Sequence, residues 1–267
     1  MIQNIHIEKM EDIDKLLLDT EYNAEIDRMR SAYFFRGMPD VSFTLATSIS
    51  RSCKNLQAVL EPAILRNFTK YASIEDPTLA GSVWKQMIVG QHHGLTTRLL
   101  DWTHSPLVAL HFAETENELE MLGKRDCVVW RIDARDLNRN LPKRYQQALD
   151  AENSYLFSVD MLRRMTDSIQ QYDADMDGKA FVMLEPPSVD QRIITQYAFF
   201  SVIPTGMADI ERFLEENTTK TVRYIIHKEI RWNLRDMLDQ YNMSERVIYP
   251  GLDGVAKWVS RHYFVKE

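Results

Sequence analysis

A chain of 267 residues, 45% hydrophobic and 27% charged, has the composition of a globular protein that can bury a sizeable core. Its formal net charge of −7 disfavours an extended nucleic acid as partner, because a polyanion would be repelled by the molecule as a whole. No apolar run approaches the roughly 18 residues of a membrane span, and no signal pattern opens the chain. We therefore expect no membrane partner and a cytoplasmic location. Cys53 and Cys127 have neither metal nor disulfide spacing, so both are expected to be free thiols.

The first part of the chain is predicted to be mainly helical. A helix is expected over residues 8–30, where Ile13 and the leucines at 16–18 form an apolar face. The apolar run 32–35 predicts a strand that ends at Arg36-Gly37, and residues 44–50 are expected to be extended or a loop. Two further helices are predicted over 56–71 and from residue 83 to Gly94.

The second part of the chain mixes strands and helices. Strands are predicted over 127–132, 180–184, 199–203 and 222–226, and helices over 207–216, 229–240 and 252–263. Residues 143–171 show an irregular helical pattern. Short strands scattered among helices predict one α+β domain, with a mixed central sheet of about five short strands surrounded by helices. We place a helical N-terminal extension at residues 1–30 and the α+β domain at residues 31–267.

The residues 173, 175 and 177 are aspartates spaced as in a calcium-binding loop. Position twelve of such a loop needs a glutamate, and the chain has Leu184 there. We therefore favour a solvated turn over 170–178 and expect no metal site.

The stretch 91–113 carries the densest set of reactive side chains. Gly94 is typical of the end of a helix, and Ser105-Pro106 is typical of the start of the next one. The residues between them are predicted to form a polar connection, which is a common place for a binding or catalytic site. The candidates within the stretch are His92, His93, Arg98, Asp101, Trp102, Thr103 and Ser105.

Each candidate has a functional and a structural interpretation. Arg36 would hold a phosphate or pyrophosphate, or form an ion pair, for instance with Asp101. Arg98 and Asp101 are three residues apart, and we favour a salt bridge between them over a polar cluster that orients a histidine.

The aromatic and imidazole candidates carry similar alternatives. One of His92 and His93 would face the site as acid, base or ligand donor. Trp102 would stack on a ligand ring, although we favour a core indole. Arg192 and Gln196 would line the same cleft or cap the strand at 199.

Several of these motifs resemble the FRG-domain family, which is named for an aromatic-Arg-Gly motif. The resemblance rests on Phe35-Arg36-Gly37, on residues 91–103 and 105–113, on 191–196 with Phe199-Phe200, and on 248–254. It covers roughly residues 25–262. It implies a domain of bacteria and their mobile elements, and it implies little about activity.

A weaker resemblance is to ADP-ribosyltransferases. In that superfamily an early strand ends in an arginine that grips the dinucleotide, as Arg36 would here. A Ser-Thr-Ser strand follows, which residues 101–105 match loosely, and a late glutamate stabilises an oxocarbenium ion. The nearest candidates for that glutamate are Gln196 and, further upstream, Glu185, although a glutamine cannot supply the negative charge.

Together these features predict a nucleotide-handling effector in bacterial defence, including defence against phage, or in a toxin system. The specific form is an ADP-ribosyltransferase-like enzyme that uses NAD. The alternative is a non-catalytic module that senses a nucleotide or binds a protein. We expect the catalytic residues among His92, His93, Asp101, Glu185 and Gln196. We expect the ligand to be bound by Arg36, Gly37, Arg98, Trp102, Thr103, Ser105 and Arg192, which should converge on one cleft.

Overall fold

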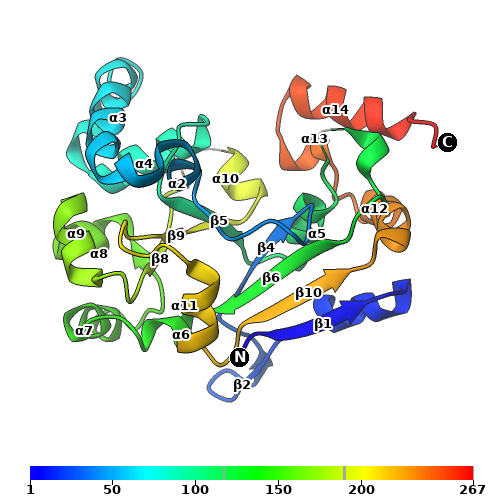
Figure 1. Ribbon diagram of the computed structural model, residues 1–267, viewed down its shortest axis with the longest axis horizontal. Coiled ribbons are helices and arrows are strands. Elements are labelled where there is room, and N and C mark those ends of the chain that lie inside the picture. The colour runs from blue at the N-terminus through cyan, green and yellow to red at the C-terminus, as the bar shows by residue number, and fades with distance from the viewer. Residues whose placement is uncertain (117, 189–190, 267) are drawn as a thin grey trace.

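A mixed sheet of eight strands runs through the computed structural model, which describes residues 1–116, 118–188 and 191–266 (Figure 1). The strand order is β1-β10-β6-β4-β5-β9-β8-β7. The pairs β1·β10 and β7·β8 are parallel, and the other pairs are antiparallel. The predicted α+β class is therefore confirmed, with more strands than the five expected. In sheet order the strands are Gln3–Ile7, Val222–Ile226, Cys127–Asp133, Tyr33–Met38, Leu99–Thr103, Ala198–Val202, Val182–Glu185 and Phe157–Ser158.

The sheet divides between β4 and β5. Strand β4 pairs with β6 through six residue pairs but with β5 only through Phe35 and Thr103. One half of the sheet is thus β1-β10-β6-β4 and the other is β5-β9-β8-β7. Beyond this single pair the two strands do not continue their ladder, and side chains from both can enter the space between them.

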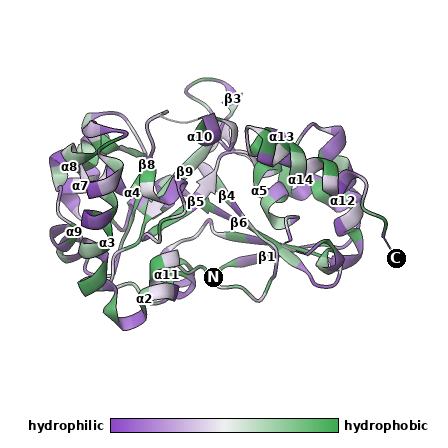
Figure 2. Cartoon of the chain, turned by 90° about the horizontal axis from the view of Figure 1, so that it is seen from above, coloured by the Kyte–Doolittle hydropathy of each residue, from purple (hydrophilic) through white to green (hydrophobic). Residues whose placement is uncertain are grey.

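Helices cover each half of the sheet and gather at its two ends (Figures 1 and 2). Four helices lie at the end of the molecule that the first half forms (Figure 1), and the first two of them bury its apolar face, which includes Tyr33, Phe35 and Val129. These helices are α5 (Pro106–Ala113), α12 (Arg231–Gln240), α13 (Glu245–Ile248) and α14 (Leu252–His262).

The other half packs against helices from the middle of the chain, around Trp84, Tyr172 and Phe200. They are α3 (Gln57–Ala72), α4 (Val83–His92), α7 (Lys143–Ala151), α8 (Val159–Met165) and α9 (Ile169–Met176). Shorter or peripheral helices are α2 (Ser48–Cys53), α6 (Ala134–Asn138), α10 (Gln191–Thr195) and α11 (Ile210–Asn217). The 3₁₀ turns are Met10–Ile13, Lys54–Leu56, Pro77–Gly81, Leu119–Met121 and Lys228–Ile230.

The start of helix α5 follows from local chemistry. Ser105 accepts a hydrogen bond from the backbone N–H of Val108, and Pro106 occupies the first turn, where its missing N–H costs nothing. Gly37 on β4 then lets the helix approach. A Cβ on Gly37 would lie 1.8 Å from the carbonyl oxygen of Ala109. We expected Gly37 to let a ligand approach the backbone, whereas the backbone that approaches it belongs to α5.

The predicted helix over residues 8–30 is wrong. Only the 3₁₀ turn Met10–Ile13 and α1 (Asp14–Leu17) are helical, followed by a hairpin of β2 (Tyr22–Asn23) and β3 (Arg28–Met29). Ile13 and Leu16 are buried, but the apolar period stops after them because the following polar residues bind the sheet. Asp19, for example, pairs with Arg131. Residues 3–7, moreover, form strand β1, which pairs with β10.

Two other expectations are also corrected. Residues 48–50 begin helix α2, where an extended segment or loop was expected. Residues 169–176 form α9, where most of the turn 170–178 was expected. The aspartates of that segment bind separate partners: Asp173 pairs with Arg98, Asp175 with Arg144 and Asp177 with Lys179. They do not converge on one ion.

Candidate functional site

A cleft of about 230 Å³ opens at the division between β4 and β5. Its polar lining comes from four elements that are far apart in the chain, and its apolar lining includes Phe35 and Phe112. The polar lining residues are Arg36, Gln91, Asp101, Thr103, Arg192 and Gln196. Two arginines and one aspartate give this lining a formal charge of one positive unit, in a chain whose net charge is −7.

Arg36 reaches from β4 across the division to β5. Its Nη1 donates to the backbone carbonyl oxygen of Asp101 at 2.8 Å and lies 3.6 Å from Oδ2 of the same residue. The side chain is only 21% exposed, and its buried Nε has no hydrogen-bond partner within the described residues. Burial lowers the pKa of Arg36 from its ordinary value, and the charge of Asp101 opposes that shift. Asp101 thus partly offsets the cost of burying the Arg36 guanidinium.

Asp101 presents a carboxylate to the cleft, and 56% of its side chain is exposed. The amide nitrogen of Gln91 donates to both carboxylate oxygens, at 3.3 and 3.1 Å. Gln91 is itself oriented, because its amide oxygen accepts from the hydroxyl of Thr97 at 2.6 Å. That hydroxyl accepts from the backbone N–H of Leu99 at 3.1 Å. A chain of three hydrogen bonds thus fixes the carboxylate relative to β5.

Arg192 of α10 and Gln196 after it form the opposite wall, and both contact the segment before α14. The amide nitrogen of Gln196 donates to the carbonyl oxygen of Ile248 at 3.2 Å. The guanidinium of Arg192 lies over the ring of Tyr249, 5.1 Å from its centroid. Burial raises the pKa of the Tyr249 phenol, while Arg192 lowers it and Asp101 adds to the rise. Tyr249 therefore lies within electrostatic reach of both charged walls of the cleft.

Arg98 lies outside the cleft and is fully buried. Its Nε and Nη2 donate to the two carboxylate oxygens of Glu61 at 2.8 and 2.5 Å, and its Nη1 donates to Asp173 at 2.5 Å. The predicted salt bridge between Arg98 and Asp101 is therefore wrong, and so is the ligand-binding role of Arg98. Residues 99–103 form a strand, on which a spacing of three does not bring side chains together as it does on a helix.

Three other candidates from the central stretch have structural roles. The Trp102 residue borders the cleft, but its indole is buried in the core and donates to Oγ of Ser201 at 3.0 Å. The hydroxyl of Thr103 accepts from the backbone N–H of Ser105 at 3.0 Å, and Ser105 caps α5. The structure thus confirms the favoured interpretation of Trp102 as a core residue.

His92, His93 and Glu185 do not line the cleft as the structure describes it. His92 is the last residue of α4, His93 follows it, and their rings meet edge to face at 5.1 Å. Glu185 ends strand β8 and is exposed, in the other half of the sheet from Arg36. The converging set is therefore smaller than the predicted one: Arg36, Gly37, Asp101, Trp102, Thr103, Arg192 and Gln196.

Gln91, Thr97 and Tyr249 are the contributors that we did not select from the sequence. Gln91 and Thr97 belong to the central stretch, whose density of reactive side chains indicated a site. The hydrogen bonds that join them to Asp101 could not be predicted, because they depend on the turn between α4 and β5. Nothing local to Tyr249 indicated its neighbour Arg192. Within the described residues, no three His, Cys, Asp or Glu side chains lie close enough to hold a metal ion.

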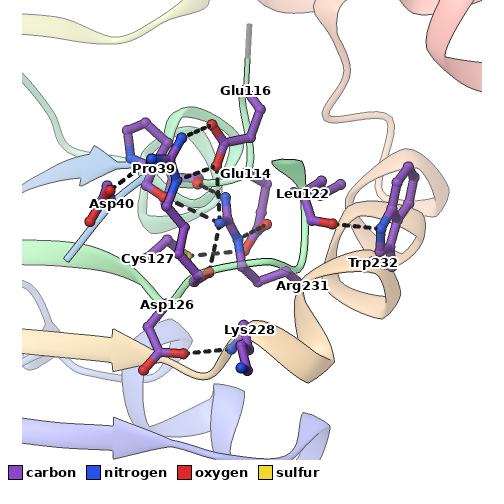
Figure 3. A network of polar contacts seen from close by, with 12 residues as sticks. Pro39, Asp40, Glu114, Glu116, Leu122, Asp126, Cys127, Lys228, Arg231 and Trp232 are labelled. Carbon is purple, nitrogen blue, oxygen red and sulfur yellow. Dashed lines mark hydrogen bonds and ion pairs between the residues drawn. The ribbon is translucent and has the colours of Figure 1, made fainter. Parts of the chain in front are cut away.

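A buried ionic network joins α12 to the end of α5 (Figure 3). Nε of Arg231 donates to Glu114 at 2.9 Å, and its Nη1 donates to Glu116 at 3.1 Å (Figure 3). Glu114 also accepts from the thiol of Cys127 at 3.3 Å. Burial raises the pKa of Glu114, and the charge of Arg231 opposes that shift. These contacts fix α12 against the end of α5, which carries Phe112 into the cleft wall.

The described residues include no helix of the length and apolarity that a membrane crossing requires. Cys53 and Cys127 are both free thiols. Comparison with curated proteins and with solved structures finds no match for this chain. The family model of the FRG domain matches residues 31–121, a range that includes Arg36, Gln91 and Asp101. Arg192 and Gln196, from the opposite wall, lie outside that range. Residues 31–121 are thus similar to the FRG domain, and this part of the chain supplies the wall of the cleft that carries its buried arginine and its exposed carboxylate.

Proposed function

We propose that the cleft binds a phosphate-bearing nucleotide and that the protein is a nucleotide-handling effector. Its specific form would be an ADP-ribosyltransferase-like enzyme that uses NAD, in bacterial defence or a toxin system. The observation that carries the proposal is Arg36, a largely buried cation that lies beside an exposed carboxylate in the lining of a small cleft. The bacterial setting rests on the family resemblance, and a reducing cytoplasmic location fits the two free thiols.

The charge of the lining supports an anionic ligand. Arg36 and Arg192 outweigh Asp101, and Arg51 also acts electrostatically on Arg36. Only Nη1 of Arg36 is engaged within the described residues, so its Nη2 is available to a phosphate oxygen. The cleft is smaller than the roughly 300–1,000 Å³ of typical small-molecule sites. It would enclose one end of a dinucleotide and leave the remainder on the surface.

The position of Asp101 supports transfer chemistry. In ADP-ribosyl transfer the bond between nicotinamide and the ribose carbon breaks, its electron pair leaves with nicotinamide, and the acceptor's nucleophile adds to that carbon as it loses a proton. Positive charge develops on the ribose, and a fixed carboxylate stabilises it. Asp101 is a carboxylate oriented by Gln91, whereas Gln196 is neutral and Glu185 lies outside the cleft. We therefore give Asp101 the role for which Gln196 and Glu185 were candidates.

Calorimetric titration of NAD, ATP and ADP-ribose tests the binding site. We expect Arg36→Ala to weaken binding at least tenfold, and Arg36→Lys nearly as much, because lysine keeps the charge and loses the planar fork. Arg212→Ala, which removes an exposed arginine paired with Glu216, is the matched control and should bind as wild type does. Circular dichroism must show that every variant is folded. If Arg36→Ala is folded and binds equally well, Arg36 is not the contact.

The catalytic step is tested separately with Asp101→Asn. This variant should bind NAD at least as well as wild type, since it removes a negative charge beside the phosphate site. The rate of nicotinamide release, measured by chromatography, should fall on the order of 100-fold. Equal release by the variant and wild type would remove Asp101 from the mechanism.

A non-catalytic nucleotide-sensing or protein-binding module is the second candidate. The observation in its favour is that Asp101 already contacts Arg36 and Gln91. Arg36 and Asp101 can therefore be a structural ion pair that takes no part in catalysis. If wild type binds a nucleotide and releases no nicotinamide, the sensing module is supported. If wild type binds none of the three nucleotides, the protein-binding module takes first place.

A further inference from the structure

Tyr249 lies where the C-terminal part of the chain meets the candidate cleft. Its ring meets that of Phe112 edge to face at 6.5 Å, and Phe112 lines the cleft. The residue before it, Ile248, accepts the hydrogen bond from the lining residue Gln196 on its carbonyl oxygen. Tyr249 is therefore at the rim of the cleft, next to lining residues from two separate parts of the chain.

Two cations lie over the ring of Tyr249. Cζ of Arg192 is 5.1 Å from the ring centroid, and Nζ of Lys257 is 5.3 Å from it. Lys257, on α14, is exposed and forms no hydrogen bond or ion pair with another described residue. The ring attracts both cations but does not neutralise them. Positive charge thus continues from Arg192 in the lining to Lys257 at the surface.

The phenol hydroxyl of Tyr249 lies within electrostatic reach of the charged lining. Burial raises the pKa of this phenol, Arg192 lowers it, and Glu245 and Asp101 add to the rise. Arg192 and Asp101 both line the cleft. Within the described residues the hydroxyl makes no hydrogen bond, and it stays protonated near neutral pH. It can therefore donate to an anion that enters from the cleft.

We propose that Tyr249 and Lys257 form a second anion position beside Arg36 and Arg192, so that the cleft takes a nucleotide with at least two consecutive phosphates. This inference rests on the proposed nucleotide site and adds the class of nucleotide. One phosphate meets Arg36 inside the cleft, and the next accepts from the hydroxyl of Tyr249 and the ammonium of Lys257. A cleft of about 230 Å³ encloses only part of a nucleotide, so a second phosphate reaches the rim.

Removing the hydroxyl alone separates this role from a structural one. Tyr249→Phe keeps the ring and its contacts with Phe112, Arg192 and Lys257. In calorimetric titrations we expect wild type to bind ADP at least tenfold more tightly than AMP. Tyr249→Phe and Lys257→Gln should each reduce this preference about fivefold, because each removes a donor to the second phosphate, and leave the dissociation constant of AMP within about twofold of wild type.

Two matched controls remove the same groups elsewhere. Tyr241→Phe takes away the hydroxyl of a tyrosine that is 57% exposed at the end of α12, and Lys143→Gln takes away an exposed charge at the start of α7. Both should keep the wild-type preference for ADP. Circular dichroism must show that all four variants are folded.

The outcomes separate this inference from the proposed function. If AMP and ADP both bind, and either wild type does not prefer ADP or Tyr249→Phe and Lys257→Gln keep the full preference, the second anion position is overturned and nucleotide binding stands. If neither nucleotide binds, inorganic pyrophosphate decides. Binding of pyrophosphate that Tyr249→Phe weakens would retain the anion position and remove the nucleotide, whereas unchanged binding or none would overturn both.

Discussion

Buried arginines have two different roles in this molecule. Arg98 and Arg231 are fully buried and meet carboxylates on several of their nitrogens, so they tie elements together. Within the described residues Arg36 uses Nη1 for β5 and its Nε is buried without a partner, so Nη2 is the nitrogen left for the cleft. The sequence pointed to Arg36, since the residue ends an apolar run beside a glycine. It also offered Asp101 as an ion-pair partner of Arg36, and the structure has that pair. The sequence could not show that Arg36 would also bind the backbone carbonyl of Asp101, because that contact joins residues 65 positions apart on two strands.

The buried ion pair of Arg98 is expected to contribute strongly to stability. Arg98→Ala should lower the free energy of unfolding by about 3–5 kcal/mol, because it leaves the carboxylate of Glu61 buried without its partner. Urea unfolding followed by circular dichroism measures this change. Arg212→Ala, which breaks an exposed pair with Glu216, should cost less than about 1 kcal/mol. A loss below about 1 kcal/mol in Arg98→Ala would mean that Glu61 is protonated or hydrated in the variant.

At the scale of elements, features that depend on neighbouring residues could be predicted from the sequence, and features that depend on pairing between distant strands could not. The start of α5 follows from Ser105-Pro106, and the prediction of a strand over 222–226 matches β10. Strand β5 was mistaken for a polar connection because Asp101 interrupts its apolar pattern, and only pairing with β4 and β9 makes it a strand. Strands β1 and β7 lie at the edges of the sheet and were missed. β1 is largely polar and exposed up to Ile7, and β7 has only two residues.

The close packing of β4 against α5 predicts a large effect of Gly37→Ala. A Cβ at this position would also lie 2.6 Å from the backbone nitrogen of Ala113, and a helix backbone cannot yield as a flexible side chain can. We expect Gly37→Ala to lower the free energy of unfolding by about 1–3 kcal/mol or more. Thermal unfolding measures it. Gly81→Ala is the control, since its Cβ would meet no atom within 4 Å, and its melting temperature should be unchanged or slightly higher.

At the scale of the whole molecule, a buried histidine links stability to pH. His111 on α5 is fully buried, and Nη1 of Arg235 lies 3.0 Å from its Nδ1. Burial, with the charge of Arg235 as the next cause, lowers the pKa of His111 to about 3. The folded protein therefore holds this imidazole neutral, and the unfolded chain binds a proton to it below its ordinary pKa of about 6.5. This contribution to stability is present above pH 6.5 and is lost as the pH falls toward 3.

The expected loss is about 1.4 kcal/mol for each pH unit below 6.5, with a further contribution of the same sign from His104, whose pKa burial also lowers. Urea unfolding at pH 7.5 and 5.5 measures it. His111→Gln keeps an acceptor for Arg235 and does not titrate, so its stability should fall less between these two pH values. Replacing the exposed His262 by glutamine should leave the pH dependence as in wild type. An equal fall in His111→Gln and wild type would show that His111 is already protonated in the folded state.

The pairing of β1 with β10 has a consequence for the order of events on the ribosome. Gln3–Ile7 is synthesised early, but the strand that it pairs with begins only at Val222. Strands β4 and β6, which lie closer together in the chain, can form their ladder long before that. Throughout this interval the early strand has no pairing partner, and an unpaired strand is the kind of segment that other chains can capture. This edge of the sheet is therefore expected to close only after β4 and β6 have paired.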